Sequence, residues 1–401
     1  MTRISFSIAV SLLGTIAAWP AQPDSARLAR AVVLEHAEFK LTPAALVFDE
    51  KGELYAGYRD EGAEKKSSAI WIRVFDPVSG KELRRTQLQT ATVPLPNGAE
   101  QFLLSLDNSM LLYAQFHGGT LIIVLNAGTF QKVSETTNLP DDVSKHFPSV
   151  NSISSDGGSV LIEAGVTNRL NGNDVQLVKL NTHDLTRVLS DLTLTNPIPE
   201  SGFSVDRDGT IWISRANGLY SYDRDRGKAT LELSVHNQDD IKSVLHLNDQ
   251  SLLLWSGQNE FGYLYRFNIT NSTLEESRRI DGCGVESVHL SPDRQYGAAL
   301  CEHQRTGEWH FGAITSRTAV IFDTKTLKIL AQVPIEKDLY PELAIWHGGE
   351  KIVLVTQADS NKLAIYEFPA PKQSGQSATV NSKDGSLRIQ VPVVASAKPK
   401  Q

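Results

Sequence analysis

The feature that most constrains the fold is a short hairpin pattern that recurs along almost the whole chain. Runs rich in Val, Ile, Leu, Tyr and Trp alternate with clusters of Gly, Asp, Asn and Ser, which is typical of strands and turns. "ALVFDEKGELYAGY" (45–58) and "GFSVDRDGTIWISR" (202–215) share one rhythm: a strand, a tight polar turn and a second strand. Related segments lie at 102–115, 152–165, 244–257, 287–300 and 343–356. The pattern predicts an all-β chain.

A second hairpin follows each of the first ones. The clearest is "IWIRVFDPVSGKELRRTQL" (70–88). Its counterparts lie at 121–136, 175–189, 219–233, 263–280 and 319–335. Two hairpins make a four-stranded antiparallel unit, and the unit recurs seven times at a spacing of roughly 40 to 57 residues. The repeat predicts a seven-bladed β-propeller over residues 31–370, with four antiparallel strands in each blade.

The seventh unit lacks a fourth strand. After "KLAIYEF" (362–368) comes "PAPKQSGQS", which is unsuited to a strand. The segment "AVVLEHAEF" (31–39) precedes the first unit and belongs to no hairpin. We therefore expect this N-terminal strand to complete the last blade and close the ring, which removes an open edge.

The two ends of the chain are expected to lie outside the propeller. Arg3 precedes an apolar run from Ile4 to Trp19, which is shorter than the roughly 20 residues of a membrane-spanning helix. The order of charge, apolar run and small residues predicts a signal peptide over 1–21 and a secreted or periplasmic protein; the alternative is an uncleaved N-terminal anchor. The tail 371–401 is polar and of low complexity, which favours disorder.

Composition narrows the choice of partners. The 401 residues carry a formal net charge of −7, and no long block of Lys and Arg is present. Nucleic acid and anionic membrane surfaces are therefore poor partners. After the N-terminal segment no apolar run approaches membrane length, so we expect no membrane span, a soluble mature protein and a monomer.

Three turn motifs resemble those of a known superfamily. The strand–"D-x-x-G"–strand rhythm, the "SPD" turn (291–293) and the "FD-x-x-T/S-x-K" turn resemble the WD-repeat and YVTN-like propellers. "DRDGTIWIS" (206–214) is also similar to the blade motif of sensor-associated propellers. The resemblance implies the propeller fold over about residues 31–370. It implies no particular activity, because this fold hosts both enzymes and scaffolds.

The connections between strands predict which face binds a ligand. With strands named a to d from the centre outward, the a–b and c–d turns share one face, and the b–c and d–a connections share the other. The first set is short and the second is long. The long segments are 59–68, 89–98, 138–148, 163–174 and 302–317. Because long loops on a rigid frame often carry binding residues, we expect the ligand on the b–c/d–a face.

The two cysteines lie in the sixth unit. Cys283 is expected at the start of strand a and Cys301 at the end of strand b, two or three residues out of register, an offset that the glycines beside Cys283 could absorb. An exported chain is expected to oxidise them to a disulfide, worth ~3 kcal/mol in the chain-entropy model. The alternative is a zinc site formed by Cys283, Cys301, His303 and His310, which lacks the usual ligand spacing.

The segment 302–317 supplies the main candidate contacts. Trp309 lies between Glu308 and His310 and is suited to anchoring a peptide or glycan, or alternatively to capping the sixth blade. The candidate ligand-binding residues are Phe147, His303, Arg305, Trp309, His310 and Tyr340. His289 is expected to be packed or hydrogen-bonded within the blade. The tryptophans expected to pack between blades are Trp71, Trp212, Trp255 and Trp346.

Five carboxylates lie just before or within the expected a strands. They are Glu100, Glu200, Asp240, Glu286 and Glu342. Lactonase-type propellers hold a divalent metal at such a channel mouth, and oxygen ligands suit Ca²⁺. The alternative is that these side chains are solvated rim charges, because their offsets from the a–b turn differ between blades.

These observations favour a binding protein over an enzyme. No nucleophile elbow, zinc-protease helix, P-loop or dinucleotide fingerprint is present in the sequence. We expect a scaffold that binds a protein, peptide or glycan without a cofactor. The alternative is a metal-dependent lactonase-like or other propeller hydrolase with its site at the channel mouth.

Overall fold

A computed structural model provides the three-dimensional structure. It describes residues 27–33, 46–61, 68–88, 100–105, 107, 109–115, 121–137, 139, 149–154, 157–168, 172–187, 192–194, 202–205, 210–215, 218–223, 228–234, 241–258, 261–304, 314–335, 343–359 and 362–371. By internal contacts the chain divides into Met1–Ala370 and Pro371–Gln401. The expected signal peptide, and all of the expected tail except Pro371, lie outside the described residues.

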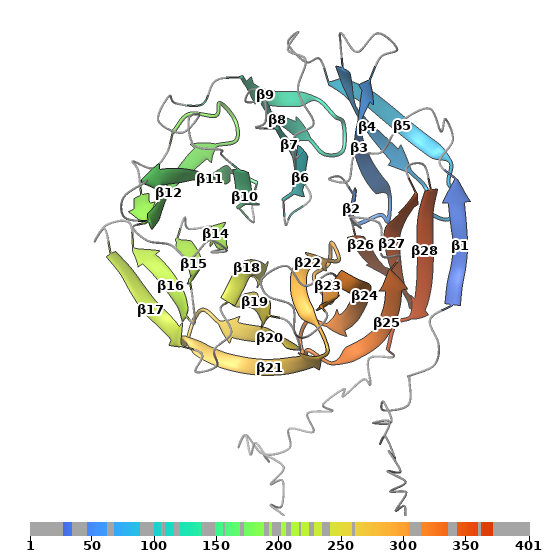
Figure 1. The fold of residues 1–401 in the computed structure, drawn as a ribbon. Helices are drawn as coiled ribbons and strands as arrows, with labels where there is room; N and C mark the ends of the chain where they lie inside the picture. The colour runs from blue at the N-terminus through green and yellow to red at the C-terminus, as the bar shows by residue number, and fades with distance from the viewer. Residues whose placement is uncertain are drawn as a thin grey trace, which may run out of the picture. The chain divides into compact units, whose positions relative to one another are not determined.

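Within Met1–Ala370 the described strands form four-stranded antiparallel sheets arranged as the blades of a propeller (Figure 1). The first three blades contain β2 (Leu46–Phe48), β3 (Leu54–Glu61), β4 (Ser68–Phe75) and β5 (Glu82–Leu88); β6 (Glu100–Leu104), β7 (Met110–Gln115), β8 (Leu121–Asn126) and β9 (Lys132–Thr136); and β10 (Ser149–Ile153), β11 (Ser159–Asn168), β12 (Gly172–Asn181) and β13 (Leu192–Leu194). The next three contain β14 (Phe203–Val205), β15 (Ile211–Arg215), β16 (Gly218–Asp223) and β17 (Lys228–Ser234); β18 (Ile241–Asn248), β19 (Ser251–Gln258), β20 (Phe261–Asn268) and β21 (Thr273–Asp281); and β22 (Gly284–Leu290), β23 (Tyr296–Gln304), β24 (Ile314–Asp323) and β25 (Ile329–Ile335).

The remaining sheet joins the two ends of the repeat. It contains β26 (Leu343–Gly348), β27 (Lys351–Asp359), β28 (Lys362–Pro369) and the N-terminal strand β1 (Arg27–Val33). β1 pairs antiparallel with β28, from Arg27 opposite Glu367 to Val33 opposite Lys362. The N-terminal strand therefore begins at Arg27, earlier than the expected 31–39. Residues 34–39 lie outside the described part.

The described strands thus make seven sheets in total, each with the a-to-d order expected from the repeat. Innermost strands of neighbouring blades contact one another, and β26 of the last blade contacts β2 of the first. The antiparallel propeller fold predicted from the hairpin repeat is confirmed.

Hydrophobic cores lie between the blades. Among the described residues there are seven buried clusters, each built from two neighbouring sheets. β23 shows why: Ala299 and Cys301 join the cluster shared with the fifth blade, while Ala298 and Leu300 join the one shared with the seventh. Alternate side chains of a strand point to opposite faces, so each central strand supplies two cores. This accounts for the apolar runs of the sequence.

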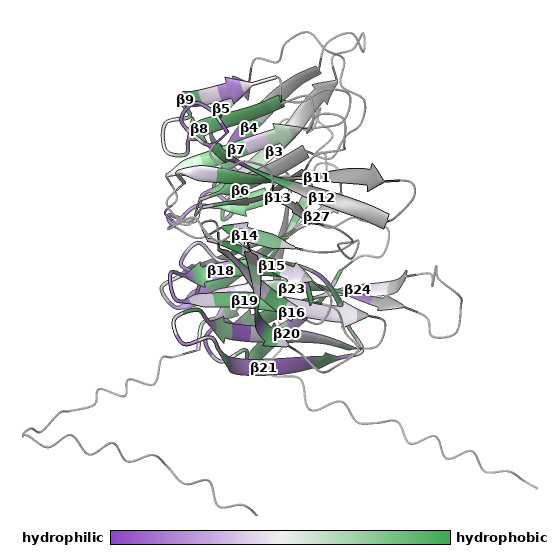
Figure 2. Ribbon diagram, turned by 90° about the vertical axis from the view of Figure 1, so that its left-hand side faces the viewer, coloured by the Kyte–Doolittle hydropathy of each residue, from purple (hydrophilic) through white to green (hydrophobic). Residues whose placement is uncertain are grey.

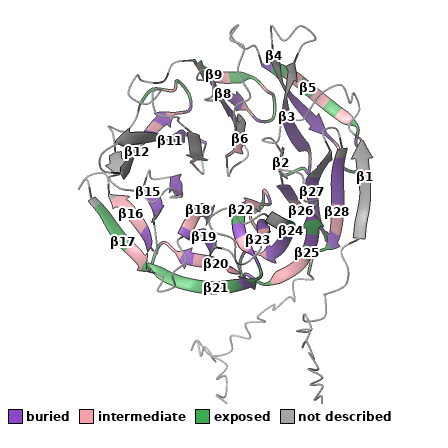
Figure 3. Ribbon diagram, in the orientation of Figure 1, coloured by how far each residue is buried: buried purple, intermediate pink, exposed green. Residues whose placement is uncertain are grey.

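Polarity changes from the inner to the outer strands. The outermost strand β21 is exposed at every residue except Ile280 and is coloured mostly as hydrophilic or exposed in Figures 2 and 3. Among the described residues, most buried positions lie on the second and third strands of the blades, such as β23 and β24 (Figure 3). The predicted packing role is confirmed for Trp212, Trp255 and Trp346, each of which joins or packs against an inter-blade cluster. Trp71 is partly buried, with the Arg85 guanidinium 5.4 Å from its ring centroid.

The c–d turns repeat one geometry. An Asp or Asn side chain caps the turn, as when the Asp323 carboxylate accepts the backbone N–H of Thr326 at 2.8 Å. The fourth residue after the cap has a positive φ. These residues are Gly80, Phe130, Leu185, Ser272 and Leu327. A left-handed residue of this kind allows a tight turn with a bulge, which explains the shared "D/N" turn spacing.

Candidate functional site at the stapled end of the sixth blade

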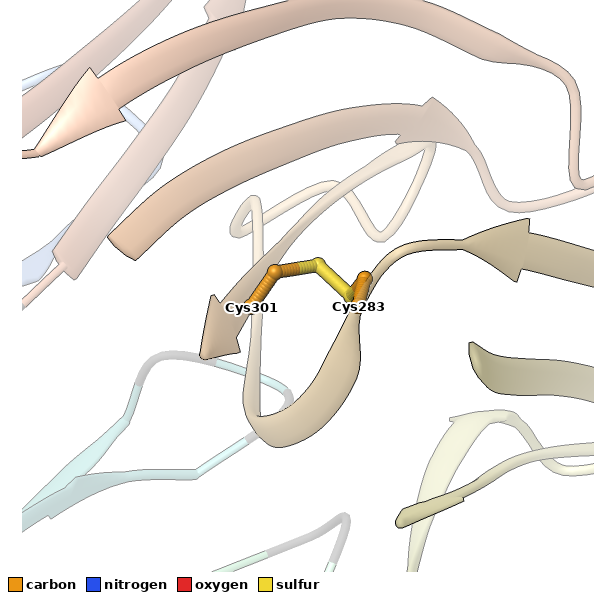
Figure 4. The surroundings of a disulfide bond; sticks show 2 residues. All are labelled: Cys283 and Cys301. Atoms are coloured by element: carbon orange, nitrogen blue, oxygen red, sulfur yellow. A yellow bond between two sulfur atoms is a disulfide. The ribbon is translucent and has the colours of Figure 1, made fainter. Parts of the chain in front are cut away.

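A disulfide joins Cys283 to Cys301, as predicted, with their Cα atoms 5.0 Å apart (Figure 4). Both side chains are buried and belong to the core between the fifth and sixth blades. Because both sulfur atoms form this bond, the alternative of a zinc site on these two cysteines is wrong for this structure. Cysteine binds zinc as a thiolate, which a disulfide does not offer.

The backbone around Cys283 explains the offset in register. Cys301 lies opposite Val285, so Cys283 sits two residues beyond the paired position. Gly282 has φ +69° and turns the chain sharply between β21 and β22. The register also shifts between Val285 and Ser287. The disulfide therefore ties a d–a connection to the end of strand b, on the predicted binding face.

An ion pair lies one residue beyond the disulfide. Glu302 in β23 and Arg317 in β24 are directly opposite, and Arg317 Nε donates to Glu302 Oε1 at 2.9 Å. The Arg317 side chain is 7% exposed and that of Glu302 16% exposed, so the pair is shielded from solvent. Sequence reasoning missed this contact. The signal was present, because opposite charges flank the loop at positions that a hairpin register brings together.

The side chains of the six candidate contact residues are not among the described parts of the structure. The backbone of His303 belongs to β23 and pairs with Ser316, but its side chain lies outside the described part. The other five candidates also lie outside the described residues: Phe147, Arg305, Trp309, His310 and Tyr340. Their convergence stays a prediction.

Only part of the predicted carboxylate ring can be placed. Glu286 is exposed on β22, and Lys242 Nζ of the neighbouring inner strand β18 lies 3.3 Å from its Oε2. A lysine so close competes with a metal cation for that carboxylate. Glu100 begins β6 without a described side chain, and Glu200, Asp240 and Glu342 lie outside the described residues. In the described part of the chain, no group of three or more His, Cys, Asp or Glu could hold a metal ion.

His289 behaves as a blade residue. Its Nε2 lies 3.3 Å from Ser287 Oγ, two residues away on the same strand face, which confirms the hydrogen-bonded role expected from the sequence. Burial lowers the pKa of His289 to about 4, because an enclosed site disfavours the charged imidazolium. The ring is therefore neutral at physiological pH.

The loop lengths differ in part from the expectation. In the segment 163–174, expected as a long loop, β11 and β12 remain paired up to Asn168 and Gly172. β19 and β20 are paired up to Gln258 and Phe261, so only two residues join them. Extending a hairpin satisfies backbone hydrogen bonds that an open loop would leave to solvent. The prediction that every connection on this face is long is wrong.

Comparison with known proteins supports the fold. No known protein family matches the chain, and neither does any curated protein sequence. A solved structure, a chain of the "Mitotic Checkpoint Complex", is similar with a TM-score of 0.52 and 13% identity. The match covers 91% of this chain and 99% of that chain. At this level of identity the likeness supports the fold alone.

Within the described residues, no helix has the length and apolar character needed to span a bilayer.

Proposed function

We propose that this protein is an interaction scaffold that binds a protein, peptide or glycan through the b–c/d–a face of the propeller. The observation that carries the proposal is the clamp formed by the Cys283–Cys301 disulfide and the Glu302–Arg317 ion pair. Both lie at the base of the connection between β23 and β24, which contains Trp309. A rigid base lowers the conformational entropy that a binding loop loses on complex formation.

The proposal includes export to an oxidising compartment. Disulfides persist in secreted and periplasmic proteins and are rare in the cytosol. The buried Cys283–Cys301 bond and the signal-like segment 1–21 both agree with export. The fold-level neighbour belongs to an assembly of proteins, which agrees with a scaffold role.

A probe array tests the proposal. Peptide and glycan arrays are incubated with the mature protein, with Trp309→Ala and with Lys325→Ala. Lys325 is an exposed cation on a c–d turn of the same blade, on the opposite face, so it is the matched control. We expect Trp309→Ala to weaken binding to the retained probe about tenfold or more and Lys325→Ala to leave it unchanged.

Two outcomes contradict the proposal. Binding that is lost in Lys325→Ala and kept in Trp309→Ala would place the ligand on the other face. The other outcome combines two observations: no probe binds, and Ca²⁺ or Zn²⁺ co-purifies with the protein but not with Glu342→Ala. That outcome would support the metal-dependent hydrolase.

A further inference from the structure

The a–b turn of the sixth blade contains an arginine where other blades have glycine. Arg294 has φ +59°, and its backbone N–H donates to the carbonyl of Ser291, three residues earlier. Gly52 and Gly157 make the same turn bond, to Asp49 and Ser154, with φ +82° and +67°. Left-handed backbone favours glycine because it has no Cβ. Arginine is thus the costlier choice at this position.

The turn does not need the arginine side chain. The backbone N–H of Arg294 is bonded to Ser291, and its carbonyl accepts the Thr324 hydroxyl at 2.6 Å. The Ser291 hydroxyl bonds the Asp293 carboxylate at 2.6 Å, which completes the turn. Glycine at position 294 would keep all of these contacts. Arg294 strains its own backbone, and its side chain is not needed to form the turn. This indicates that the side chain has another role.

The guanidinium of Arg294 has an unused donor. The side chain is half-buried, and its Nε is enclosed without a hydrogen-bond partner among the described residues. Asp293 is adjacent, but its Oδ1 accepts from Ser291 and Gln295, and its Oδ2 lies 2.6 Å from His347 Nδ1. Enclosed polar groups normally have partners, so the free Nε–H indicates a missing acceptor.

The charge of this group persists at neutral pH. Burial lowers the pKa of Arg294 to about 10, which still leaves the guanidinium protonated near pH 7. β22 is the innermost strand of its sheet, so its turn to β23 lies at the inner edge of the blade. Arg294 therefore lies on the a–b/c–d face, where its carbonyl contacts Thr324 of the c–d turn, opposite the disulfide-bonded end of the blade.

We propose that Arg294 binds an oxyanion, the phosphate or carboxylate group of a ligand, on the a–b/c–d face of the sixth blade. A planar guanidinium presents parallel N–H donors that match two oxygens of such a group. The site is on the opposite face from the proposed binding loop, and it is independent of that proposal.

Thermal unfolding in matched salts tests the proposal. The mature protein is heated in sodium phosphate, sodium acetate and sodium chloride at equal ionic strength and pH. The variants are Arg294→Gly, Arg294→Ala, which keeps a Cβ on the left-handed backbone, and Lys81→Ala, an exposed cation on the first blade. Phosphate stabilises folded proteins in general, so the diagnostic quantity is the difference between proteins.

We expect phosphate or acetate to raise the midpoint of the natural protein by about 2 °C relative to chloride. If only phosphate raises the midpoint, the ligand group is a phosphate. If only acetate raises it, the ligand group is a carboxylate. Lys81→Ala should retain the increment, and both Arg294 variants should lose it. Arg294→Gly should also unfold no earlier than the natural protein in chloride.

Two results overturn the proposal. One is a rise in the thermal midpoint, in phosphate or acetate relative to chloride, that is the same in the natural protein and in both Arg294 variants. The absence of any such rise in all three proteins has the same meaning. The other is an earlier unfolding of Arg294→Gly in chloride, because it would show that the arginine holds a structural partner.

Discussion

The indole of Trp346 lies directly against Gly52 at the junction between the last and the first blade. A Cβ added at Gly52 would lie 2.7 Å from Trp346 Cε2, well inside contact distance. Trp346 also donates its Nε1–H to the Glu50 carbonyl at 3.4 Å. Behind this contact, the core shared by the two blades includes Phe48 and Val355. Residues almost 300 positions apart thus meet, and the ring closes here through side chains as well as through strands.

Replacing Gly52 is expected to weaken this junction. Gly52→Ala adds a Cβ where φ is +82° and where the indole leaves no room. We expect a loss of about 2–3 kcal/mol in the free energy of unfolding, measured in urea. Gly349→Ala is the matched control, since it has φ +62° and nothing within 4 Å of the new Cβ. It should lose only about 1 kcal/mol, from backbone strain. Equal losses would contradict a packing role for Gly52.

The disulfide is expected to stabilise the sixth blade. Cys283→Ala combined with Cys301→Ala removes a bond that closes a span of 18 residues. The expected loss is about 3 kcal/mol, because the unfolded chain regains conformational freedom. Chemical denaturation of the variant and of the natural protein measures it. Mass spectrometry after alkylation without reductant should find both thiols blocked in the natural protein, and labelled thiols there would contradict the bond.

Two left-handed turn residues should respond in opposite directions to glycine. Ser272 is exposed with φ +50°, and its hydroxyl donates to Glu232 Oε2 at 2.9 Å. Because exposed side chains exchange such a bond for one with water, the relief of backbone strain should dominate, and Ser272→Gly should stabilise the protein by about 0.5 kcal/mol. Leu327 has φ +52° but is fully buried in the core between the fifth and sixth blades. Leu327→Gly should therefore cost about 2–4 kcal/mol, because lost burial outweighs relieved strain. Urea unfolding measures the free energy of unfolding of both variants. An increase in both would contradict the prediction of opposite effects.

The pattern of hairpins was sufficient to predict the propeller, because period-two apolar runs and Asp/Asn-capped turns are local signals. The disulfide was predictable for a similar reason, since the strand register brings two isolated cysteines close together. The start of β1 was not predictable to the residue, because its pairing with β28 is a contact between distant segments. The opposite charges of Glu302 and Arg317 indicated a possible pair, but the exact register of their hairpin, which shifts between His303 and Gln304, could not be derived from the sequence. The packing of Trp346 against Gly52 joins distant segments, which no local window contains.

His289 should make the protein sensitive to acid. Its pKa is about 4 in the folded protein against 6.5 in the unfolded chain, so below pH 6.5 the unfolded state binds more protons. Stability should be unaffected by this group above pH 6.5, fall as the pH drops from 6.5 to about 4, and then level off. His289→Gln cannot titrate, so its urea-unfolding profile should lose this part of the slope. An identical pH slope in the two proteins would contradict the burial of the ring.

The N-terminal strand is expected to act as a latch on the last blade. β1 forms the outermost strand beside β28, so removing it exposes the unpaired edge of β28. Two truncated proteins separate this effect from loss of the preceding segment: one begins at residue 27 and the other at residue 34. The first should unfold like the natural mature protein. The second should show a lower thermal midpoint and concentration-dependent association through the exposed edge, seen by light scattering. Equal midpoints and monomeric behaviour in both would show that the blade is stable with three strands.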